Sequence, residues 1–428
     1  MRIYKNISRQ DWPQLCQRPK LQTADLDNIV EEVFEQVRLF GDKSVKKYTL
    51  KFDGIEPEQI QVSEEAWNEG IDRVPDELKR AIQQAKRNIE VFHKAQLNER
   101  INVETEDGVQ CWQESRAIQK VGLYIPGGTA PLFSTVLMLA VPAKLAGCEE
   151  IILCTPPDKQ GNIPSPILYA ARLTGVSKVM KIGGIQAIAA LTYGTKSVPQ
   201  VYKIFGPGNQ YVTAAKQKAF SEGTAIDLPA GPSELLVIAD ESANPAFIAS
   251  DLLSQAEHGI DSQVVCISNS FQLLESVNDE IEKQLPALPR AEIAGKSLKN
   301  ARFLFSASKE DSIGFINAYA PEHLIITSID EAFYLENLKN AGSVFVGNYT
   351  PESAGDYLSG TNHTLPTNGF ARSFGSLGIN DFTKKISFQR ISPEGIKKIG
   401  NSIELMARAE GLEAHAKAVE MRLKRIEK

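Results

Sequence analysis

The sequence predicts an α/β protein with two Rossmann-like domains built on parallel sheets, a small N-terminal helical segment and a helical C-terminal tail. From about residue 120 onward, short apolar runs, several of them ending at glycine or proline turns, alternate with helical segments rich in small residues. Buried parallel strands have this pattern. The runs also form two successive sets of similar design, as a duplication would produce. The first set comprises residues 121–125, 150–154, 178–182 and 201–205, and the second comprises residues 234–238, 263–267, 323–327 and 342–346.

Two amphipathic helices are predicted before the first strand. Apolar residues recur at helical spacing from Leu26 to Phe40, and the pattern stops at glycine, a common residue just beyond a helix end. A second helix opens at Pro75, and its apolar stripe runs to Phe92. His93 lies on this helix without the acidic and glycine neighbours of the other histidines, so we interpret it as structural.

Beyond residue 380 the sequence predicts helices that are detached from the α/β body. Ser392 opens a helix with an apolar stripe from Ile396 to Met406, Gly411 ends it, and a basic helix follows. A small helical tail cannot bury its apolar stripe alone. We therefore expect it to pack on a larger body, either its own or that of another subunit.

Charge and composition argue against nucleic-acid and membrane partners. The chain has 47 basic and 53 acidic residues, and a net charge of −6 provides no basic surface for nucleic acid or anionic lipid. No apolar run approaches the roughly 18 residues that span a bilayer, and the first residues lack the apolar core of a secretory signal. We expect a cytoplasmic protein.

The five cysteines do not form a recognisable site. None of them shares a C-x-x-C spacing, which argues against a disulfide framework and a thiolate zinc site. Cys154 and Cys266 fall in apolar strand-like runs, where cysteine acts as a small core residue. A catalytic thiol in an enzyme that oxidises aldehydes is the less favoured alternative.

Four of the five histidines lie in short polar segments beside carboxylates or amides, namely His258, His323, His363 and His415. Neutral imidazole binds transition metals well, so this pattern indicates a metal site. Gln255 and His258 would share one helix face and could contact one metal ion. The alternative is that His258 has no ligand and only lies at the C-terminal end of a helix, where its interaction with the helix dipole is stabilising. Asp251, one turn earlier, is interpreted as a cap or surface charge.

Glu322 and His323 form an adjacent acid/base pair at the start of a predicted strand. In a regular strand they would face opposite sides, so a shared pocket requires the turn at Pro321 to redirect one of them. Such a pair suits proton transfer near neutral pH. The polar loop containing Asp356 and His363 is a natural place for a ligand.

The turns after the predicted strands give only a weak indication of a cofactor. Ligands of parallel sheets bind at the carboxyl ends of the strands. However, no turn has the G-x-G-x-x-G spacing of a dinucleotide-binding fingerprint. The glycine pairs alone do not distinguish phosphate binding from tight turns.

Six segments make the chain closely resemble the histidinol dehydrogenase family over nearly its whole length. They are residues 226–240 (IDLPAGPSELLVIAD), 249–259 (ASDLLSQAEHG), 320–324 (APEHL), 354–357 (AGDY), 360–366 (GTNHTLP) and 410–415 (EGLEAH). The resemblance implies a zinc-dependent enzyme that oxidises L-histidinol to L-histidinal and then to L-histidine. Each step would use one NAD, and these are the last two steps of histidine biosynthesis.

The resemblance also implies roles for individual residues. The zinc ligands would be Gln255, His258, Asp356 and His415. The acid/base pair would be Glu322 and His323. Substrate contacts would be Ser233, Gln255, His258, His323, Asp356, Glu410 and His415. NAD contacts would be Tyr124, Gln186 and Asn209.

A homodimer follows from the resemblance and from the unpartnered tail, and the chain divides into four predicted parts. Residues 1–20 form an N-terminal segment. Residues 21–123 and 233–377 form the α/β domain with most metal and catalytic residues. Residues 124–232 form the second α/β domain, with the NAD contacts, and residues 378–428 form the tail, which two subunits would exchange.

Two rival functions fit the residues without the resemblance. A zinc hydrolase or lyase on an α/β frame could use the same His/Asp/Gln site, but it would not reduce NAD when supplied with histidinol. A two-lobed binding protein for a small molecule would also have paired α/β units, but it would turn nothing over.

Overall fold

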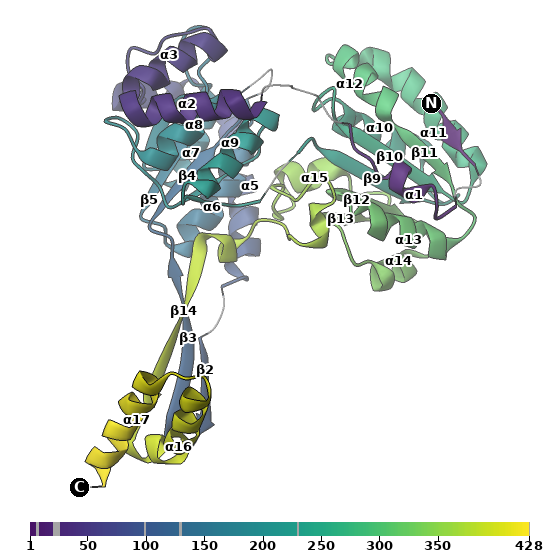
Figure 1. Ribbon diagram of the computed structural model, residues 1–428. Coiled ribbons are helices and arrows are strands. Elements are labelled where there is room, and N and C mark those ends of the chain that lie inside the picture. The colour runs from purple at the N-terminus through teal and green to yellow at the C-terminus, as the bar shows by residue number, and fades with distance from the viewer. Residues whose placement is uncertain (6–7, 20–25, 98–99, 128–130, 229–230, 428) are drawn as a thin grey trace.

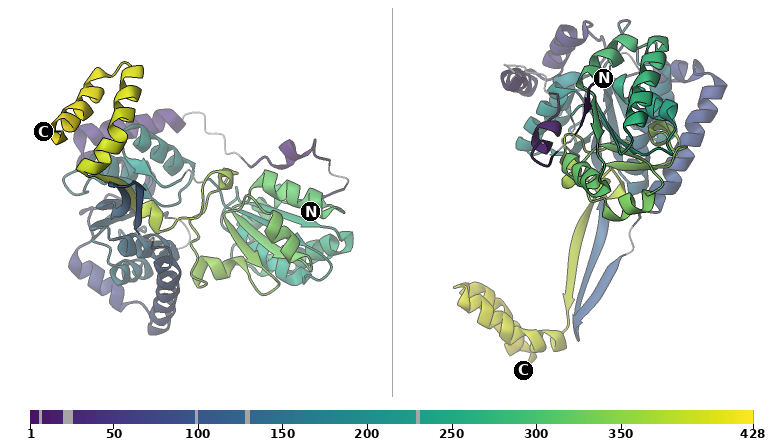
Figure 2. Two further views of the ribbon diagram at one scale, coloured as in Figure 1. Left: turned by 90° about the horizontal axis from the view of Figure 1, so that it is seen from below. Right: turned by 90° about the vertical axis from the view of Figure 1, so that its right-hand side faces the viewer.

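The computed structural model describes residues 1–427 except 6–7, 20–25, 98–99, 128–130 and 229–230. In the described part, two α/β lobes lie side by side, and an arm projects from one of them (Figure 1). The N-terminus lies on the lobe without the arm, and the C-terminus lies at the tip of the arm (Figure 2). The prediction of two parallel-sheet units is therefore confirmed.

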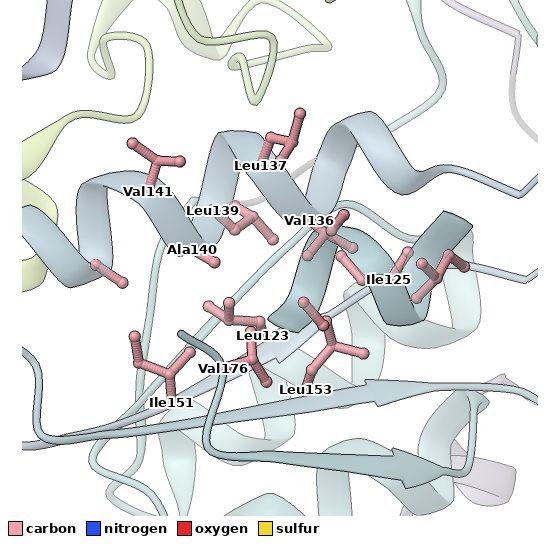
Figure 3. Close-up of a cluster of buried hydrophobic side chains, with 14 of the residues drawn as sticks. Leu123, Ile125, Val136, Leu137, Leu139, Ala140, Val141, Ile151, Leu153 and Val176 are labelled. Carbon is pink, nitrogen blue, oxygen red and sulfur yellow. The ribbon is translucent and has the colours of Figure 1, made fainter. Parts of the chain in front are cut away.

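The five-stranded lobe carries the arm. Its parallel strands have the order β6-β5-β4-β7-β8. They are β4 (Lys120–Tyr124), β5 (Glu150–Thr155), β6 (Lys178–Lys181), β7 (Lys203–Phe205) and β8 (Ala225–Ile226). Helices α6 (Phe133–Ala146) and α7 (Ser165–Thr174) cover one face, and α8 (Gly184–Tyr193) and α9 (Gln210–Ser221) cover the other. Figure 3 shows α6 packed over the apolar residues of this sheet, including Leu123 and Leu153.

The N-terminal helices pack on this same lobe, which corrects the predicted domain assignment of residues 21–123. These helices are α2 (Leu26–Phe40), α3 (Asp42–Asp53), α4 (Glu64–Asp72) and α5 (Asp76–Lys94). Val33 and Phe34 of α2 share a core with α8, whereas Ile82 and Ile89 of α5 share a core with α6. Amphipathic patterns identify the buried face of a helix but not the sheet that it covers, and the boundary predicted at residue 21 lies outside the described residues.

The six-stranded lobe repeats the design. Its parallel strands have the order β1-β11-β10-β9-β12-β13. They are β1 (Ile3–Tyr4), β9 (Glu234–Ala239), β10 (Gln263–Ser268), β11 (Arg302–Phe305), β12 (His323–Thr327) and β13 (Ser343–Val346). Its helices are α1 (Trp12–Leu15), α10 (Pro245–Ala256), α11 (Phe271–Gln284), α12 (Ala291–Ser297), α13 (Lys309–Tyr319), α14 (Glu331–Asn337) and α15 (Glu352–Tyr357). Apart from β1, the strand order is that of the other sheet, as a duplication would produce.

The arm is only partly helical, which corrects the prediction for residues 378–428. Its strands β2 (Ile101–Glu106), β3 (Val109–Ala117) and β14 (Thr383–Ile391) form an antiparallel sheet in the order β14-β3-β2. The predicted helices follow as α16 (Pro393–Ala409) and α17 (Glu413–Ile426). The sequence missed β14 because most of its residues are exposed, so it lacks the apolar run of a buried strand.

No helix in the described ranges is long and apolar enough to cross a membrane.

His93 is fully buried, and its Nδ1 lies 2.8 Å from the carbonyl oxygen of Ile89. This agrees with its interpretation as a structural residue.

Candidate active site

The acid/base pair lies at the amino ends of strands, which corrects the expectation that ligands of both sheets bind at the carboxyl ends. His323 is the first residue of β12, and Glu234, the first residue of β9, pairs beside it. Gln255 reaches the same edge because α10 runs antiparallel to the strand that precedes it and ends there. In this lobe the predicted site residues therefore gather at the opposite edge from the usual one.

The backbone of one residue, Glu234, contacts both members of the pair. The backbone N–H of Glu234 donates to Glu322 Oε2 at 2.7 Å, and His323 Nδ1 lies 3.2 Å from the carbonyl oxygen of Glu234. The distance between Glu322 Oε2 and His323 Nδ1 is 3.7 Å. Ala320, with φ +53°, adopts the left-handed conformation just before Pro321. This turn brings both side chains to one side, as a shared pocket requires.

His323 is arranged as a neutral base. Its Nδ1 donates to the Glu234 carbonyl, which assigns the proton to Nδ1 and leaves a lone pair on Nε2. Nε2 is buried and has no hydrogen-bond partner among the described residues. Burial lowers the pKa of His323 to about 4, although the nearby Asp356 carboxylate opposes the shift. The ring is therefore neutral at neutral pH and can accept a proton.

Glu352, which the sequence did not identify as a site residue, lies beside the pair, and Asp251 lies beside Glu352. Glu352 is 1% exposed, and its Oε1 lies 3.4 Å from His323 Nδ1. Burial raises the pKa of Glu352 and that of Glu322 well above the ordinary value. Asp251 is not a surface charge, because it is half-buried and accepts a hydrogen bond from the backbone N–H of Glu352; burial raises its pKa to about 6. The position of Glu352, one helical turn before Asp356, was the signal that could have identified it.

Three of the four predicted metal ligands belong to this lobe. Gln255 is fully buried, and neither its Oε1 nor its Nε2 has a hydrogen-bond partner in the described part of the chain. His258 is exposed, two residues beyond the end of α10. Asp356 Oδ1 lies 4.0 Å from His323 Nε2 and 3.7 Å from His363 Nδ1. A buried amide without partners is what a ligand site would leave, so these residues fit a metal ion.

The remaining predicted residues are not brought to this cluster by their own chain. Glu410 and His415 are both exposed, near the junction of α16 and α17 on the arm. Figure 1 shows these helices at the far end of the arm, away from α15. Among the described residues, no group of three or more His, Cys, Asp or Glu side chains could hold a metal ion.

His363 lies at the contact between the two lobes. Its Nε2 is 3.2 Å from Thr135 Oγ1 of α6, and its Nδ1 is 3.0 Å from the carbonyl oxygen of Asp356. A small cavity of about 40 Å³ lies beside it. The lining residues include Gly206 and Pro207 of the five-stranded lobe and Ser233 and Glu322 of the six-stranded lobe. Glu322 thus faces the other lobe across this cavity.

A larger cavity of about 670 Å³ lies at the carboxyl ends of the five-stranded sheet. This volume is within the range of small-molecule and cofactor pockets, roughly 300–1,000 Å³. Tyr124 and Asn209 line it, and Gln186 is buried behind the lining residue Asp53, to which its Nε2 donates at 3.2 Å. The structure therefore brings the three predicted cofactor residues together at the predicted edge. The Pro126-Gly-Gly turn beside them lies partly outside the described residues.

A buried ion pair fixes Glu234, the residue beside the Glu322–His323 pair. Arg18 donates to both carboxylate oxygens of Glu234, at 3.0 and 2.9 Å, and its guanidinium lies 3.7 Å from the centroid of the Tyr319 ring. The Arg18 and Glu234 side chains are 8% and 1% exposed. The N-terminal segment thus fixes the residue whose backbone holds Glu322 and His323.

We expect Arg18→Met to lower the free energy of unfolding by about 3–5 kcal/mol, because it leaves a buried carboxylate without its partner. Denaturant titration would measure the loss. Arg9→Met is the matched control, since the Arg9–Asp311 pair is 73% and 50% exposed, and it should cost at most about 1 kcal/mol. Equal losses in the two variants would show that the buried pair has no special role.

The fold and the site together define the class of the protein. A cofactor-sized cavity at the carboxyl ends of one parallel sheet and a buried carboxyl–imidazole pair in the other lobe are parts expected of a nucleotide-linked oxidoreductase. The profile of the histidinol dehydrogenase family matches residues 16–423, and the chain belongs to this family. Its members are NAD-linked oxidoreductases of the final steps of histidine biosynthesis. Membership decides against the hydrolase, lyase and binding-protein alternatives.

Relatives and solved structures agree with this assignment. The chain is 55% identical over 423 residues to histidinol dehydrogenase of Bacteroides thetaiotaomicron and 48% identical over 427 residues to that of Mannheimia succiniciproducens, with 99% of each chain covered in both cases. Histidinol dehydrogenase from Elizabethkingia anophelis has a TM-score of 0.97 at 52% identity, covering 100% of this chain and 99% of that chain. An acetylating aldehyde dehydrogenase from Geobacillus thermoglucosidasius has a TM-score of 0.50 at 15% identity, covering 89% of this chain and 94% of that chain, which shows a shared fold alone.

Proposed function

We propose that the protein oxidises L-histidinol through L-histidinal to L-histidine with two molecules of NAD, at a zinc site shared by two copies of the chain. The assignment of this reaction rests on membership of the family over nearly the whole chain. The unpartnered, fully buried amide of Gln255 beside the acid/base pair is the observation that carries the site. A cytoplasmic location stays an expectation from the sequence.

Gln255, His258 and Asp356 of one chain and His415 of a second chain would hold the zinc ion. All four supply nitrogen or oxygen atoms, a donor set that suits zinc and also manganese or cobalt. When bound, the metal would orient the substrate and polarise the groups attached to it. Ser233 and Glu410 would contact the substrate beside these ligands.

His323 would act in the first oxidation. Its unprotonated Nε2 accepts the hydroxyl proton of the alcohol while hydride leaves for NAD in the neighbouring lobe. The Glu234 carbonyl stabilises the imidazolium that forms, because Nδ1 donates to it.

Glu322 would act in the second oxidation, which requires water to add to the aldehyde. Burial raises the pKa of Glu322 well above its ordinary value, which makes this carboxylate a stronger base than an exposed one. It lines the small cavity between the lobes, which is large enough for water. Keeping the aldehyde at this site protects it from side reactions.

The arm supports a homodimer in which each tail completes the site of the other copy. Leu405, Met406 and Met421 are 66–73% exposed on the two arm helices. Apolar side chains so exposed on a projecting arm are suited to a partner surface. The same exchange would bring Glu410 and His415 to a cluster that their own chain leaves incomplete.

We expect metal removal to abolish turnover and zinc to restore it. The experiment is chelation, followed by measurement of zinc content per chain and of NADH formation from histidinol. Manganese or cobalt should restore part of the activity, because no thiolate takes part. Full activity in demonstrably metal-free protein would contradict the proposal.

A further inference from the structure

The 670 Å³ cavity contains a carboxylate in an unfavourable position. Asp53 is the last residue of α3 and lines the cavity. A negative charge at the C-terminal end of a helix is opposed by the helix dipole. Burial raises the pKa of Asp53 to about 6, and only the neutral Gln186 amide opposes this shift. A residue that breaks a local rule in this way is a candidate for a functional role.

Among its described lining residues, the cavity has no cation to compensate this charge. Its described lining contains two carboxylates, Asp53 and Asp158, and neither lysine nor arginine. Asp158 is already used locally, since its Oδ1 accepts from the backbone N–H groups of Gln160 and Asn162. Asp53 accepts only the Gln186 Nε2–H in the described structure, so its remaining lone pairs are available to a ligand with hydroxyl donors.

The position of Asp53 indicates which part of the cofactor it meets. The N-terminal ends of α8 and α9, at Gly184 and Asn209, border the cavity and suit the pyrophosphate. The nicotinamide must reach the acid/base pair in the six-stranded lobe. Figure 1 shows α3 on the side of the five-stranded lobe that is away from that pair. This leaves the α3 side of the cavity, which Asp53 lines, for the adenosine half.

We propose that Asp53 accepts hydrogen bonds from the adenosine ribose diol and excludes a 2′-phosphate, so that it selects NAD over NADP. This inference rests on the proposed function of the cavity. A ribose diol supplies two donors to one carboxylate, as in other dinucleotide sites. A 2′-phosphate would bring about −1.5 to −2 charges to a site that has a carboxylate and, among its described lining residues, no lysine or arginine.

The test compares NAD and NADP in the zinc-loaded protein, by calorimetric binding and by kcat/KM with histidinol. Asp53→Asn should weaken the affinity for NAD about tenfold, because a charge-assisted hydrogen bond is lost. It should also reduce the ratio of kcat/KM with NAD to kcat/KM with NADP by roughly 10- to 100-fold. Its melting temperature should not fall, since the substitution removes a charge that the helix dipole opposes. Asp158→Asn is the matched control for net charge and should narrow the ratio by at most about threefold.

The possible results distinguish failure of this inference from failure of the proposed function of the cavity. If Asp53→Asn leaves the NAD:NADP ratio of kcat/KM at its wild-type value, the inference alone is overturned. The same holds if Asp158→Asn reduces this ratio as much as Asp53→Asn does. Wild-type protein that binds neither NAD nor NADP would overturn the proposed cofactor cavity, and the inference with it.

Discussion

His323→Asn is expected to slow the oxidation of histidinol by about 100- to 10,000-fold, the usual range for loss of a general base. Asparagine preserves polarity and approximate size but cannot accept the hydroxyl proton. The buried Nε2, which has no partner in the described structure, is the atom on which this prediction depends. Single-turnover measurement of NADH with histidinol as the substrate would test it.

Glu322→Gln should instead slow mainly the oxidation of the aldehyde, because only that step needs an activated water. Histidinal supplied directly isolates the second step, and the ratio of the two rates separates the two residues. His93→Asn is a control for the loss of a buried histidine: it can change stability, but should leave that ratio unchanged. Small, equal effects of the Glu322 and His323 variants on both steps would refute the assignment.

His415→Ala is expected to abolish activity, although His415 is exposed on α17, which lies at the far end of the arm from α10 and α15. An exposed substitution normally changes stability by at most about 0.5 kcal/mol, so the melting temperature should stay near that of the wild type. Activity and thermal unfolding measured on one sample would show this separation. Lys417→Ala, an exposed change on the same helix, is the matched control and should remain active. Near-normal turnover by His415→Ala would exclude it as a metal ligand.

The sequence predicted most of the strands that are buried on both faces and missed the exposed ones; it also missed β11, a short strand whose two central residues are buried. β9 and β12 are apolar runs with every residue buried, which makes them recognisable. β8 has two residues and β14 is mostly exposed, so neither produces such a run. The shared strand order of the two sheets could not be predicted, because it depends on pairing between distant segments.

The site was predicted by residue type but not by place. Motifs identified Glu322 and His323, but their position at the amino end of β12 depends on the Ala320 turn, whose positive φ no pattern indicated. Glu234 was predicted only as the first residue of a strand. Its role follows from a long-range contact with Arg18, which no local pattern contains.

The claim that two copies build each site is tested most directly by mixing two inactive variants. His258→Ala and His415→Ala should each be inactive alone. After reversible dissociation and random reassociation, half of the dimers would carry one intact site of two, and about a quarter of wild-type activity should return. If heterodimers demonstrably form and no activity returns, the tail acts within its own chain and the shared site is refuted.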